Sequence, residues 1–259
     1  MKVLALGDVF GRPGRKILAQ QAGALKKEFG ADFMIVNLEN ASGGSGVTEA
    51  NARELLEISA VDVYTSGNHI WDKKDVNNII QESSRILRPA NYPSPCPGRG
   101  YEIYRVGGVR VGVVNLSGTV YLNQLDNPFH TFDKIYEIIS SACDMICVDF
   151  HAEVTSEKIA FGYYADGRAS VIYGTHTHVL TADERILKNG CGYLTDIGMT
   201  GPLDGVIGVE KEIIIRQFLT QRRARYEVAE GPVQVNGAVF TLDDKFHCVG
   251  IERVRRIYD

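Results

Sequence analysis

The sequence predicts an α/β fold in which two β-sheets stack face to face with helices on the outside. Short apolar runs alternate with longer segments of helical period in the first two thirds of the chain, which is typical of α/β units. The last third consists mainly of strand-like runs. No linker-like segment interrupts the 259 residues, so we expect a single domain, for which this length supplies a sizeable core.

The composition is that of an ordinary globular protein. Hydrophobic residues make up 44% of the chain and charged residues 23%, which excludes a disordered chain. Because 28 Lys and Arg face 32 Asp and Glu, the formal net charge is −4, and we expect neither stable nucleic-acid binding nor attraction to an anionic membrane.

We expect neither a targeting segment nor a membrane anchor. The first residues reach Gly7 and Asp8 too soon for a signal peptide. No apolar run approaches the roughly 20 residues that span a bilayer. Five cysteines, none in a C-x-x-C pair, favour a reducing compartment, so we expect a cytoplasmic protein.

The elements of the first two thirds follow from short apolar runs and from helical spacing. Pro13 suits the first turn of a helix, where its missing N–H would have no partner. The predicted strands are Lys2–Leu6, 33–38, 61–65, 145–150 and 170–173. The predicted helices are 13–29, one opened by Thr48 that carries Leu55, Leu56 and Ile58, 75–81, 132–143 and 157–165.

A hairpin, a loop and a β-rich end complete the predicted fold. Gly107 and Gly108 separate strands 101–106 and 109–115, which indicates a tight hairpin. Residues 92–98 contain three prolines, which fix φ and remove donors, so they form a loop. The strand-like runs of the last third are 192–195, 212–219, 225–228, 238–242 and 249–254.

Five predicted strands end at a carboxylate, carboxamide or imidazole side chain. Ligands of open α/β sheets bind at the carboxyl ends of the strands, so these side chains should converge. His176 and His178 are two residues apart in an extended segment and face the same way, about 6.6 Å apart. Two such imidazoles suit a pair of ions separated by about 3.5–4 Å. The residues are Asp8, Glu39, Asn40, Asn68, His69, His151, His176 and His178.

Each of these residues also has an ordinary structural interpretation. Asp8 suits a helix cap or a turn, and the pairs 39–40 and 68–69 suit turns. His151 alone is compatible with a hydrogen-bonded core histidine. The metal site is therefore predicted from the whole set and not from any one residue.

This set of side chains suits two divalent cations. Two neighbouring cations repel each other, so an anionic carboxylate must bridge them, and either Glu39 or Asp8 can do so. Nitrogen and oxygen donors without a thiolate favour manganese or iron, with zinc as an alternative. A hydroxide held between two ions forms near neutral pH and can attack phosphorus in line. His69 is suited to protonate the leaving oxygen, because histidine titrates near neutral pH.

The same residues resemble the calcineurin-like metallophosphoesterases. Phe10 stands where most members carry a histidine ligand, and Ile70 follows the Asn-His pair in place of an acid. Such departures characterise the YmdB-like branch of that superfamily, which the chain resembles over most of its length. The matching segments are Gly7-Asp8-Val9-Phe10-Gly11, Glu39-Asn40 in place of Gly-Asp, Gly67-Asn68-His69, His151, and Gly174-Thr175-His176-Thr177-His178 with Thr175 inserted.

The resemblance implies a fold, an activity and a set of roles. The fold would be a four-layer α-β-β-α sandwich of the metallophosphoesterase type over residues 1–259. The activity would be hydrolysis of phosphodiesters, including 2′,3′- and 3′,5′-cyclic nucleotides, with iron or manganese. The resemblance is also compatible with a homo-oligomer. Asp8, Glu39, Asn40 and His178 would hold one ion, and Glu39, Asn68, His151 and His176 the other, with Glu39 bridging and His69 as proton donor.

Other interpretations stay open at this point. A phosphatase or an RNA-processing nuclease could use the same centre, and a regulatory binding protein could keep it with little turnover. The glycines of 43–46 are not followed by Lys-Ser/Thr, so they form no P-loop, and we interpret them as a turn. We interpret the arginines near 222–225 and 253–256 as solvated surface rather than an RNA track. Residues 195–199 receive no role.

Overall fold

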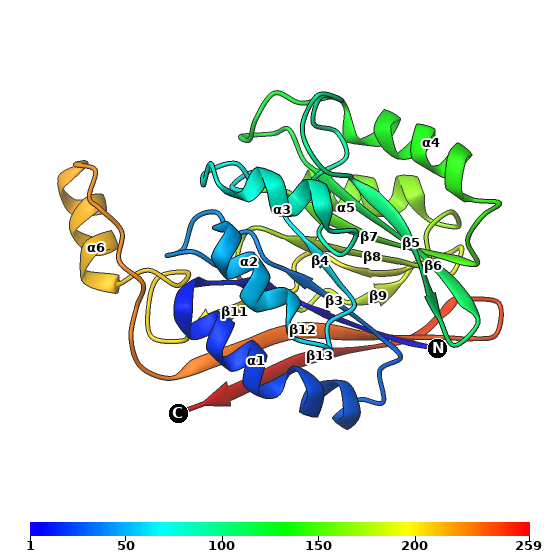
Figure 1. Ribbon diagram of the computed structural model, residues 1–259. Helices are drawn as coiled ribbons and strands as arrows, with labels where there is room; N and C mark the ends of the chain where they lie inside the picture. The colour runs from blue at the N-terminus through cyan, green and yellow to red at the C-terminus, as the bar shows by residue number, and fades with distance from the viewer.

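A computed structural model describes residues 1–259 and has four layers, with two β-sheets facing each other and helices covering their outer faces (Figure 1). The predicted α-β-β-α sandwich is therefore confirmed. Side chains of a strand point alternately to its two faces, and this alternation produces the layers. In the first strand, Val3 and Ala5 pack between the sheets, whereas Leu4 and Leu6 pack against the helices.

The first sheet has seven strands in the order β2-β11-β12-β1-β3-β4, with β13 paired to β12. The strands β1, β3 and β4 are parallel, so their carboxyl ends lie at one edge. The bounds are β1 (Lys2–Leu6), β2 (Asp8–Val9), β3 (Phe33–Asn37), β4 (Val63–Thr65), β11 (Met199–Pro202), β12 (Val233–Leu242) and β13 (Cys248–Tyr258).

The second sheet has six strands in the order β5-β6-β7-β8-β10-β9. The strands β6, β7, β8 and β10 are parallel, and β5 joins β6 through the predicted hairpin at Gly107 and Gly108. The bounds are β5 (Tyr101–Val106), β6 (Val109–Ser117), β7 (Met145–His151), β8 (Val171–Thr175), β9 (Arg185–Ile186) and β10 (Gly192–Leu194).

Five helices cover the two outer faces. Helices α1 (Gly11–Glu28), α2 (Glu49–Leu56) and α3 (Val76–Glu82) bury their apolar faces against the first sheet, and α4 (Pro128–Ile139) and α5 (Thr155–Ala165) against the second. Thr48 opens α2 as predicted, because its hydroxyl accepts a bond from the N–H of Asn51 at 3.2 Å, but Ile58 lies beyond the end of that helix.

Helix α4 begins four residues before the predicted start and ends four residues before the predicted end. The Asn127 side chain accepts bonds from the N–H groups of Phe129 and His130 at 2.9 and 3.3 Å, and Pro128 occupies the first turn. A cap followed by proline fixes a helix start more strongly than the apolar spacing does.

Two strand predictions in the last third are wrong. Residues 212–219 form most of helix α6 (Lys211–Thr220), which projects away from both sheets (Figure 1). Residues 225–228 form no strand, and Val228 makes only an isolated bridge to Val209. Strand propensity depends on a neighbouring strand to pair with. Residues 213–215 do not pair with a sheet edge, so this β-branched run makes its backbone hydrogen bonds within a helix.

None of the helices combines the length and the apolar character needed to cross a membrane. All five cysteines are free thiols.

Candidate metal centre

The predicted metal ligands all follow or end parallel strands at one edge of the sandwich. Asp8 begins β2 directly after β1, residues 39–40 follow β3, and residues 68–69 follow β4. The second sheet contributes His151 at the end of β7, and His176 and His178 just after β8. The convergence that the sequence predicted therefore brings together ligands from both sheets.

His151 lies at the centre of the first group of ligands. Its Nε2 atom is 3.0 Å from Glu39 Oε1, 3.0 Å from Asn68 Oδ1 and 3.1 Å from His176 Nδ1. Its Nδ1 atom lies 3.9 Å from Asp8 Oδ1. Ligand atoms of Glu39, His151 and His176 all lie within 4.8 Å of one another, so one cation can contact all three.

Asn40 and His178 form a second group beside the first. His178 Nε2 lies 3.2 Å from Asn40 Oδ1, and the backbone N–H of His176 donates to Asp8 Oδ2 at 3.3 Å. A pocket of about 370 Å³ is lined by members of both groups, among them Glu39, Asn40, His176 and His178. The ring of Phe10, at the position of the usual histidine ligand, packs edge-on against His178 with centroids 5.5 Å apart.

Two buried carboxylate oxygens show that this centre fits cations. Asp8 Oδ1 and Glu39 Oε1 are buried and make no hydrogen bond, and the cation nearest to Glu39 Oε1 is the His151 ring, whose Nε2 atom lies 3.0 Å away, so both oxygens are free to accept a metal ion. Gly67 lets these side chains approach the backbone closely, because a Cβ on Gly67 would collide with His151 Nε2 and with Glu39 Oε2. Carboxylate, carboxamide and imidazole donors are a set suited to manganese, iron or zinc.

The ionisation of the centre follows from burial and from mutual attraction. Burial raises the pKa of the Asp8 carboxyl well above its usual range. Burial acts in the same direction on Glu39, but the adjacent His151 lowers the Glu39 pKa to about 2. Burial opposes the charge on His151, yet Glu39 raises the His151 pKa to about 9. In the metal-free protein His151 is thus the cation beside Glu39, and a metal ion bound to its Nε2 atom would displace the proton there.

The other two histidines are poised to be neutral. Burial, followed by the positive charge of His151, lowers the pKa of His176 to about 3. Burial also lowers the pKa of His178, although the carbonyl of Ile207, 2.9 Å from its Nδ1 atom, acts in the opposite direction. Neutral imidazoles are the form that binds metals.

The inserted Thr175 connects His151 to a buried carboxylate. The Nδ1 atom of His151 lies 2.8 Å from Thr175 Oγ1, and the Thr175 hydroxyl donates to Asp149 Oδ1 at 2.7 Å. Asp149 also accepts bonds from the Thr65 hydroxyl and from the Asn37 amide. This chain holds the Nδ1 side of the ring, so the Nε2 atom faces the other ligands.

The loop that carries His176 and His178 has a strained backbone and is bonded to two buried charged side chains. Both residues have positive φ, 97° and 64°, which is uncommon for residues other than glycine, so the prediction that 176–178 is an extended segment is wrong. The Lys158 ammonium, only 1% exposed, donates to the Thr175 carbonyl at 2.8 Å and to Asp196 Oδ2 at 2.7 Å. Asp196 in turn accepts bonds from the N–H and hydroxyl of Thr177 at 3.1 and 2.8 Å. Residues 195–199, unassigned from sequence, thereby anchor this loop.

His69 lies on the rim of the pocket, apart from the buried ligands. Its backbone N–H donates to Glu39 Oε2 at 3.1 Å, and its Nδ1 atom lies 2.8 Å from Asp72 Oδ2. The Ser45 hydroxyl also donates to Asp72, so the glycine-rich turn supports the histidine. With Nδ1 engaged, the Nε2 atom is the one available to a substrate in the pocket.

Sequence reasoning missed Asp72, Glu153, Lys158 and Asp196. Glu153 Oε2 lies 2.9 Å from His176 Nε2, which leaves the His176 Nδ1 atom to face the centre. Spacing offers a signal for two of them, since Asp72 is three residues from His69 and Glu153 is two from His151. Asp196 lies in the segment 195–199, which sequence reasoning singled out without assigning a role. For Lys158 there is no signal, because the helical spacing of 157–165 does not predict a buried lysine.

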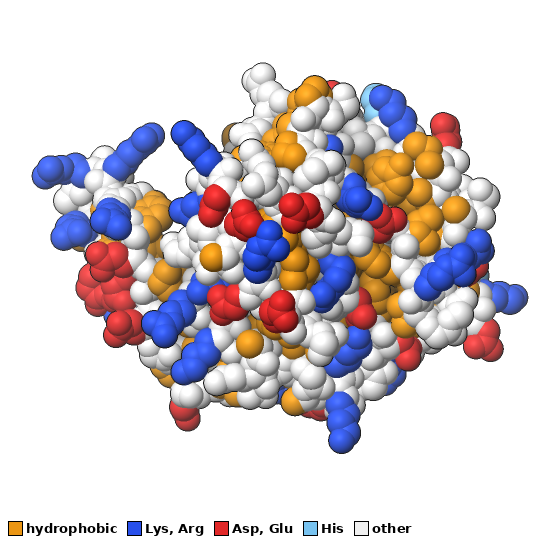
Figure 2. Space-filling model, in the orientation of Figure 1, with side chains coloured by type: hydrophobic (Ala, Val, Ile, Leu, Met, Phe, Trp, Pro, Cys, Tyr) orange, Lys and Arg blue, Asp and Glu red, His pale blue; other side chains and the backbone are white.

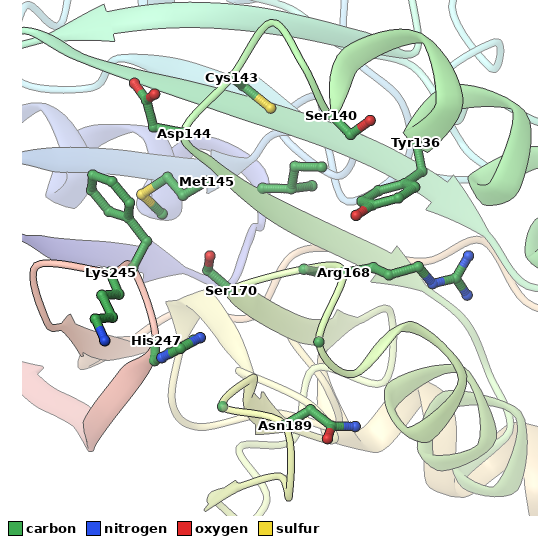
Figure 3. A pocket seen from close by; sticks show the side chains of 15 residues that line it. Tyr136, Ser140, Cys143, Asp144, Met145, Arg168, Ser170, Asn189, Lys245 and His247 are labelled. Carbon is green, nitrogen blue, oxygen red and sulfur yellow. The ribbon is translucent and has the colours of Figure 1, made fainter.

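A different cavity lies at the opposite ends of the strands. It has about 200 Å³ and is lined by residues before and at the start of β7 and β8, among them Asp144, Met145 and Ser170, with Arg168 and His247 at its sides (Figure 3). None of the predicted site residues lines this cavity.

Comparison with known proteins places the chain among phosphoesterases. Residues 4–254 match a family model described as YmdB-like protein. A Bacillus subtilis (strain 168) protein named 2′,3′-cyclic-nucleotide 2′-phosphodiesterase is 44% identical over 255 residues, which cover 98% of this chain and 96% of that protein.

Two solved structures are similar over nearly their whole length. A hypothetical protein from Thermus thermophilus has a TM-score of 0.93 and 36% identity, with 100% of both chains covered. A structure described as a novel phosphatase from Mycoplasma pneumoniae has a TM-score of 0.92 and 35% identity, with 99% of this chain and 93% of that chain covered. The predicted metallophosphoesterase type of sandwich is confirmed by these neighbours.

Proposed function

The chain belongs to the YmdB-like family, and from this premise we propose that it is a metal-dependent phosphodiesterase that hydrolyses 2′,3′- or 3′,5′-cyclic nucleotides. The observation that carries the proposal is the pair of buried oxygens Asp8 Oδ1 and Glu39 Oε1, which make no hydrogen bond and lie 3.9 and 3.0 Å from the ring nitrogens of His151 on the other sheet. The proposal treats residues 1–259 as one cytoplasmic catalytic domain.

Two ions are proposed, in the arrangement that the resemblance implies. We assign one ion to Asp8, Glu39, Asn40 and His178, and the second to Glu39, Asn68, His151 and His176. Iron or manganese is the proposed metal, with zinc as the alternative. When bound, the two cations supply Lewis acidity and lower the pKa of water towards neutrality.

The protein's own residues complete the reaction. In the hydrolysis of a cyclic phosphodiester, the oxygen of water forms a bond to phosphorus and one ribose oxygen leaves. That leaving oxygen takes up a proton, which we assign to the Nε2 atom of His69, and the water proton returns to solvent or to His69. Asp72 holds the Nδ1 side of the ring, which keeps Nε2 directed into the pocket.

A direct test compares a phosphodiester with a phosphomonoester. The protein is assayed with bis(p-nitrophenyl) phosphate and p-nitrophenyl phosphate in the presence of Mn²⁺. We expect a clear preference for the diester. A cyclic nucleotide is itself a phosphodiester, and its phosphate carries one negative charge fewer than that of a monoester. Clear preference for the monoester would instead support a phosphatase, the second candidate, which the name of the Mycoplasma pneumoniae structure favours.

A regulatory protein with little turnover makes a different prediction. In that case His69→Ala would abolish hydrolysis and leave the cellular role intact. Under the enzymatic proposal the cellular role is lost together with hydrolysis, and the metal content stays unchanged.

A further inference from the structure

Helix α6 and the segment after it project from the body beside the metal centre (Figure 1). We call residues 211–226 the arginine arm. The arm reaches the metal centre at Tyr226, which lines the same pocket as Glu39 and His176. The Tyr226 hydroxyl accepts a bond from the Gln217 amide of α6 at 3.0 Å, so the tyrosine is tied to the helix.

The arm carries four arginines without acidic partners. Arg216, Arg222, Arg223 and Arg225 line a cavity of about 480 Å³ between α6 and the segment that follows it, together with Thr220 and Glu227. None of the four forms an ion pair within the molecule. Basic side chains gather at the outer end of the arm, and a notch separates that end from the body (Figure 2).

The two cavities are adjacent along the chain. Arg225 and Glu227 line the arginine cavity, whereas Tyr226 between them lines the pocket over the metal centre. A cyclic mononucleotide has a single phosphate, which the metal centre itself takes up. Four unpaired guanidinium groups next to that centre therefore exceed what a mononucleotide needs, and a nucleotide chain supplies one further phosphate per residue.

We propose that the arginine arm binds the backbone phosphates of a short single-stranded RNA whose terminal 2′,3′-cyclic phosphate lies at the metal centre. The proposal rests on the proposed phosphodiesterase function and names its substrate class. Two exposed aromatic rings support single-stranded RNA, because Tyr226 is 51% and Phe218 70% exposed, and unstacked bases bind to such rings.

The chemistry of the substrate points to the reaction that supplies it. A 2′,3′-cyclic phosphate forms when the 2′-hydroxyl of RNA attacks the neighbouring phosphorus and expels the 5′-oxygen of the next nucleotide. Transesterifying RNA cleavage thus leaves the cyclic phosphate at the 3′ end of a chain. Hydrolysis here joins the oxygen of water to phosphorus and breaks the bond between phosphorus and one ribose oxygen, which takes up a proton. The product is an RNA with a terminal monophosphate.

The test compares an oligomer with a mononucleotide. The substrates are a five-nucleotide RNA that ends in a 2′,3′-cyclic phosphate and 2′,3′-cyclic AMP, both with Mn²⁺. The variants are Arg222→Gln with Arg223→Gln, and as a control Arg105→Gln with Lys188→Gln, which removes two exposed charges outside both cavities. Thermal unfolding of all variants checks that they fold alike.

We expect the wild type to have a KM for the oligomer at least about tenfold below that for 2′,3′-cyclic AMP. The arm variant should raise the oligomer KM by about tenfold, the order expected for two exposed charge-assisted contacts. The kcat/KM of the arm variant for 2′,3′-cyclic AMP should stay unchanged. The control variant should keep both its KM for the oligomer and its kcat/KM for 2′,3′-cyclic AMP. Raising the salt concentration should weaken oligomer binding with a slope near −0.7 per phosphate contacted.

Binding without turnover separates this inference from the hydrolytic proposal. A fluorescent five-nucleotide RNA with a 3′-monophosphate should bind the wild type and bind the arm variant about tenfold more weakly. Failure to hydrolyse either cyclic substrate would end the phosphodiesterase proposal, whereas hydrolysis of 2′,3′-cyclic AMP without oligomer preference or RNA binding would overturn this inference alone.

A second copy of the chain is the competing occupant of the arm. Ile215, Phe218 and Leu219 are exposed at helical spacing on α6, a pattern that also suits helix pairing. Native mass is therefore measured by light scattering for each variant. If the arm variant lowers the mass and impairs both substrates equally, the arm serves assembly, and the RNA proposal is overturned.

Discussion

The buried oxygens of Asp8 and Glu39 decide the chemistry of the centre at the scale of single residues. Neither Asp8 Oδ1 nor Glu39 Oε1 has a hydrogen-bond partner, and both face imidazole nitrogens. Asp8 also accepts the backbone N–H of His176, whereas Glu39 accepts that of His69. Glu39 therefore touches both the predicted ligands and the residue that we assign as proton donor.

Substituting Glu39 with Gln should lower the occupancy of both ions. A neutral amide cannot offset the repulsion between two cations that share it, so elemental analysis after desalting should find fewer than two metals per chain. Glu137→Gln, an exposed change on α4, serves as the control with unchanged metal. Two tightly held metals in Glu39→Gln would contradict the bridging role.

Substituting His69 with Ala should leave the metals bound and reduce the rate by roughly 10²- to 10⁴-fold, the usual contribution of a general acid. His69 lies on the pocket rim, its ring nitrogen Nδ1 lies beside Asp72 and Ser45, and its bond to Glu39 comes from the backbone, so the predicted ligands stay in place. The loss should shrink for substrates with acidic leaving groups, which need no proton. A uniform loss across leaving groups would argue against proton donation.

At the scale of elements, the loop after β8 depends on one buried ion pair. Lys158 of α5 joins the Thr175 carbonyl to Asp196, and Asp196 binds Thr177 between the two histidines. A helix on the outer face of the second sheet thus fixes ligands at its edge. Strained backbone persists where surrounding contacts hold it, and these bonds support the positive φ of His176 and His178.

Substituting Lys158 with Met should lower the free energy of unfolding by about 3–5 kcal/mol, because Asp196 is left as an unpaired buried charge. The loop should also loosen, so that Mn²⁺ binds more weakly. Urea unfolding and Mn²⁺ titration measure the two effects, with the exposed Lys188→Met as control. A loss below about 1 kcal/mol with unchanged Mn²⁺ affinity would show that the pair does not hold the loop.

At the scale of the whole molecule, the centre lies where the two sheets meet. Asp8, Glu39 and Asn68 come from the first sheet, and His151 and His176 from the second. Ions held by these residues would link the sheets, and binding to the folded state alone stabilises it by about 2.7 kcal/mol at a metal concentration of 100 Kd. For a chain of this size that corresponds to roughly 5–10 °C in Tm.

The stabilisation by Mn²⁺ should grow with pH. Without metal, the pKa values of Asp8 and His151 are raised, that of His151 to about 9, so the stability they contribute is complete at low pH and lost as pH rises through these values. The metal-free Tm should therefore fall from pH 6 to pH 9. Mn²⁺ binds the deprotonated forms, so the Tm gain should be larger at pH 8.5 than at pH 6.

Scanning calorimetry with EDTA or with excess Mn²⁺ at both pH values measures this dependence. The Glu39→Gln variant should show a smaller gain at each pH. An equal gain at pH 6 and pH 8.5 in the wild type would mean that metal binding displaces no proton.

The sequence by itself determined the sandwich and the residues that gather at its edge. Continuous apolar runs such as Val3 to Leu6 predict strands that are buried on both faces, and parallel strands bring their carboxyl ends together, so Glu39 and His151 converge although 112 positions separate them. The boundaries were less certain, as α4 shows, because a cap and a proline act locally against the apolar period.

Only the tertiary structure decided the fate of 212–219 and the supports of the ligands. The run favours a strand by composition, but a strand needs a partner, and α6 lies away from both sheets. Likewise, Lys158 and Asp196 are 38 positions apart and become partners through packing of α5 against the second sheet. The secondary-structure preference of a segment depends on its neighbouring residues in the sequence. Strand pairing and buried charge pairs depend instead on distant segments that the fold brings together.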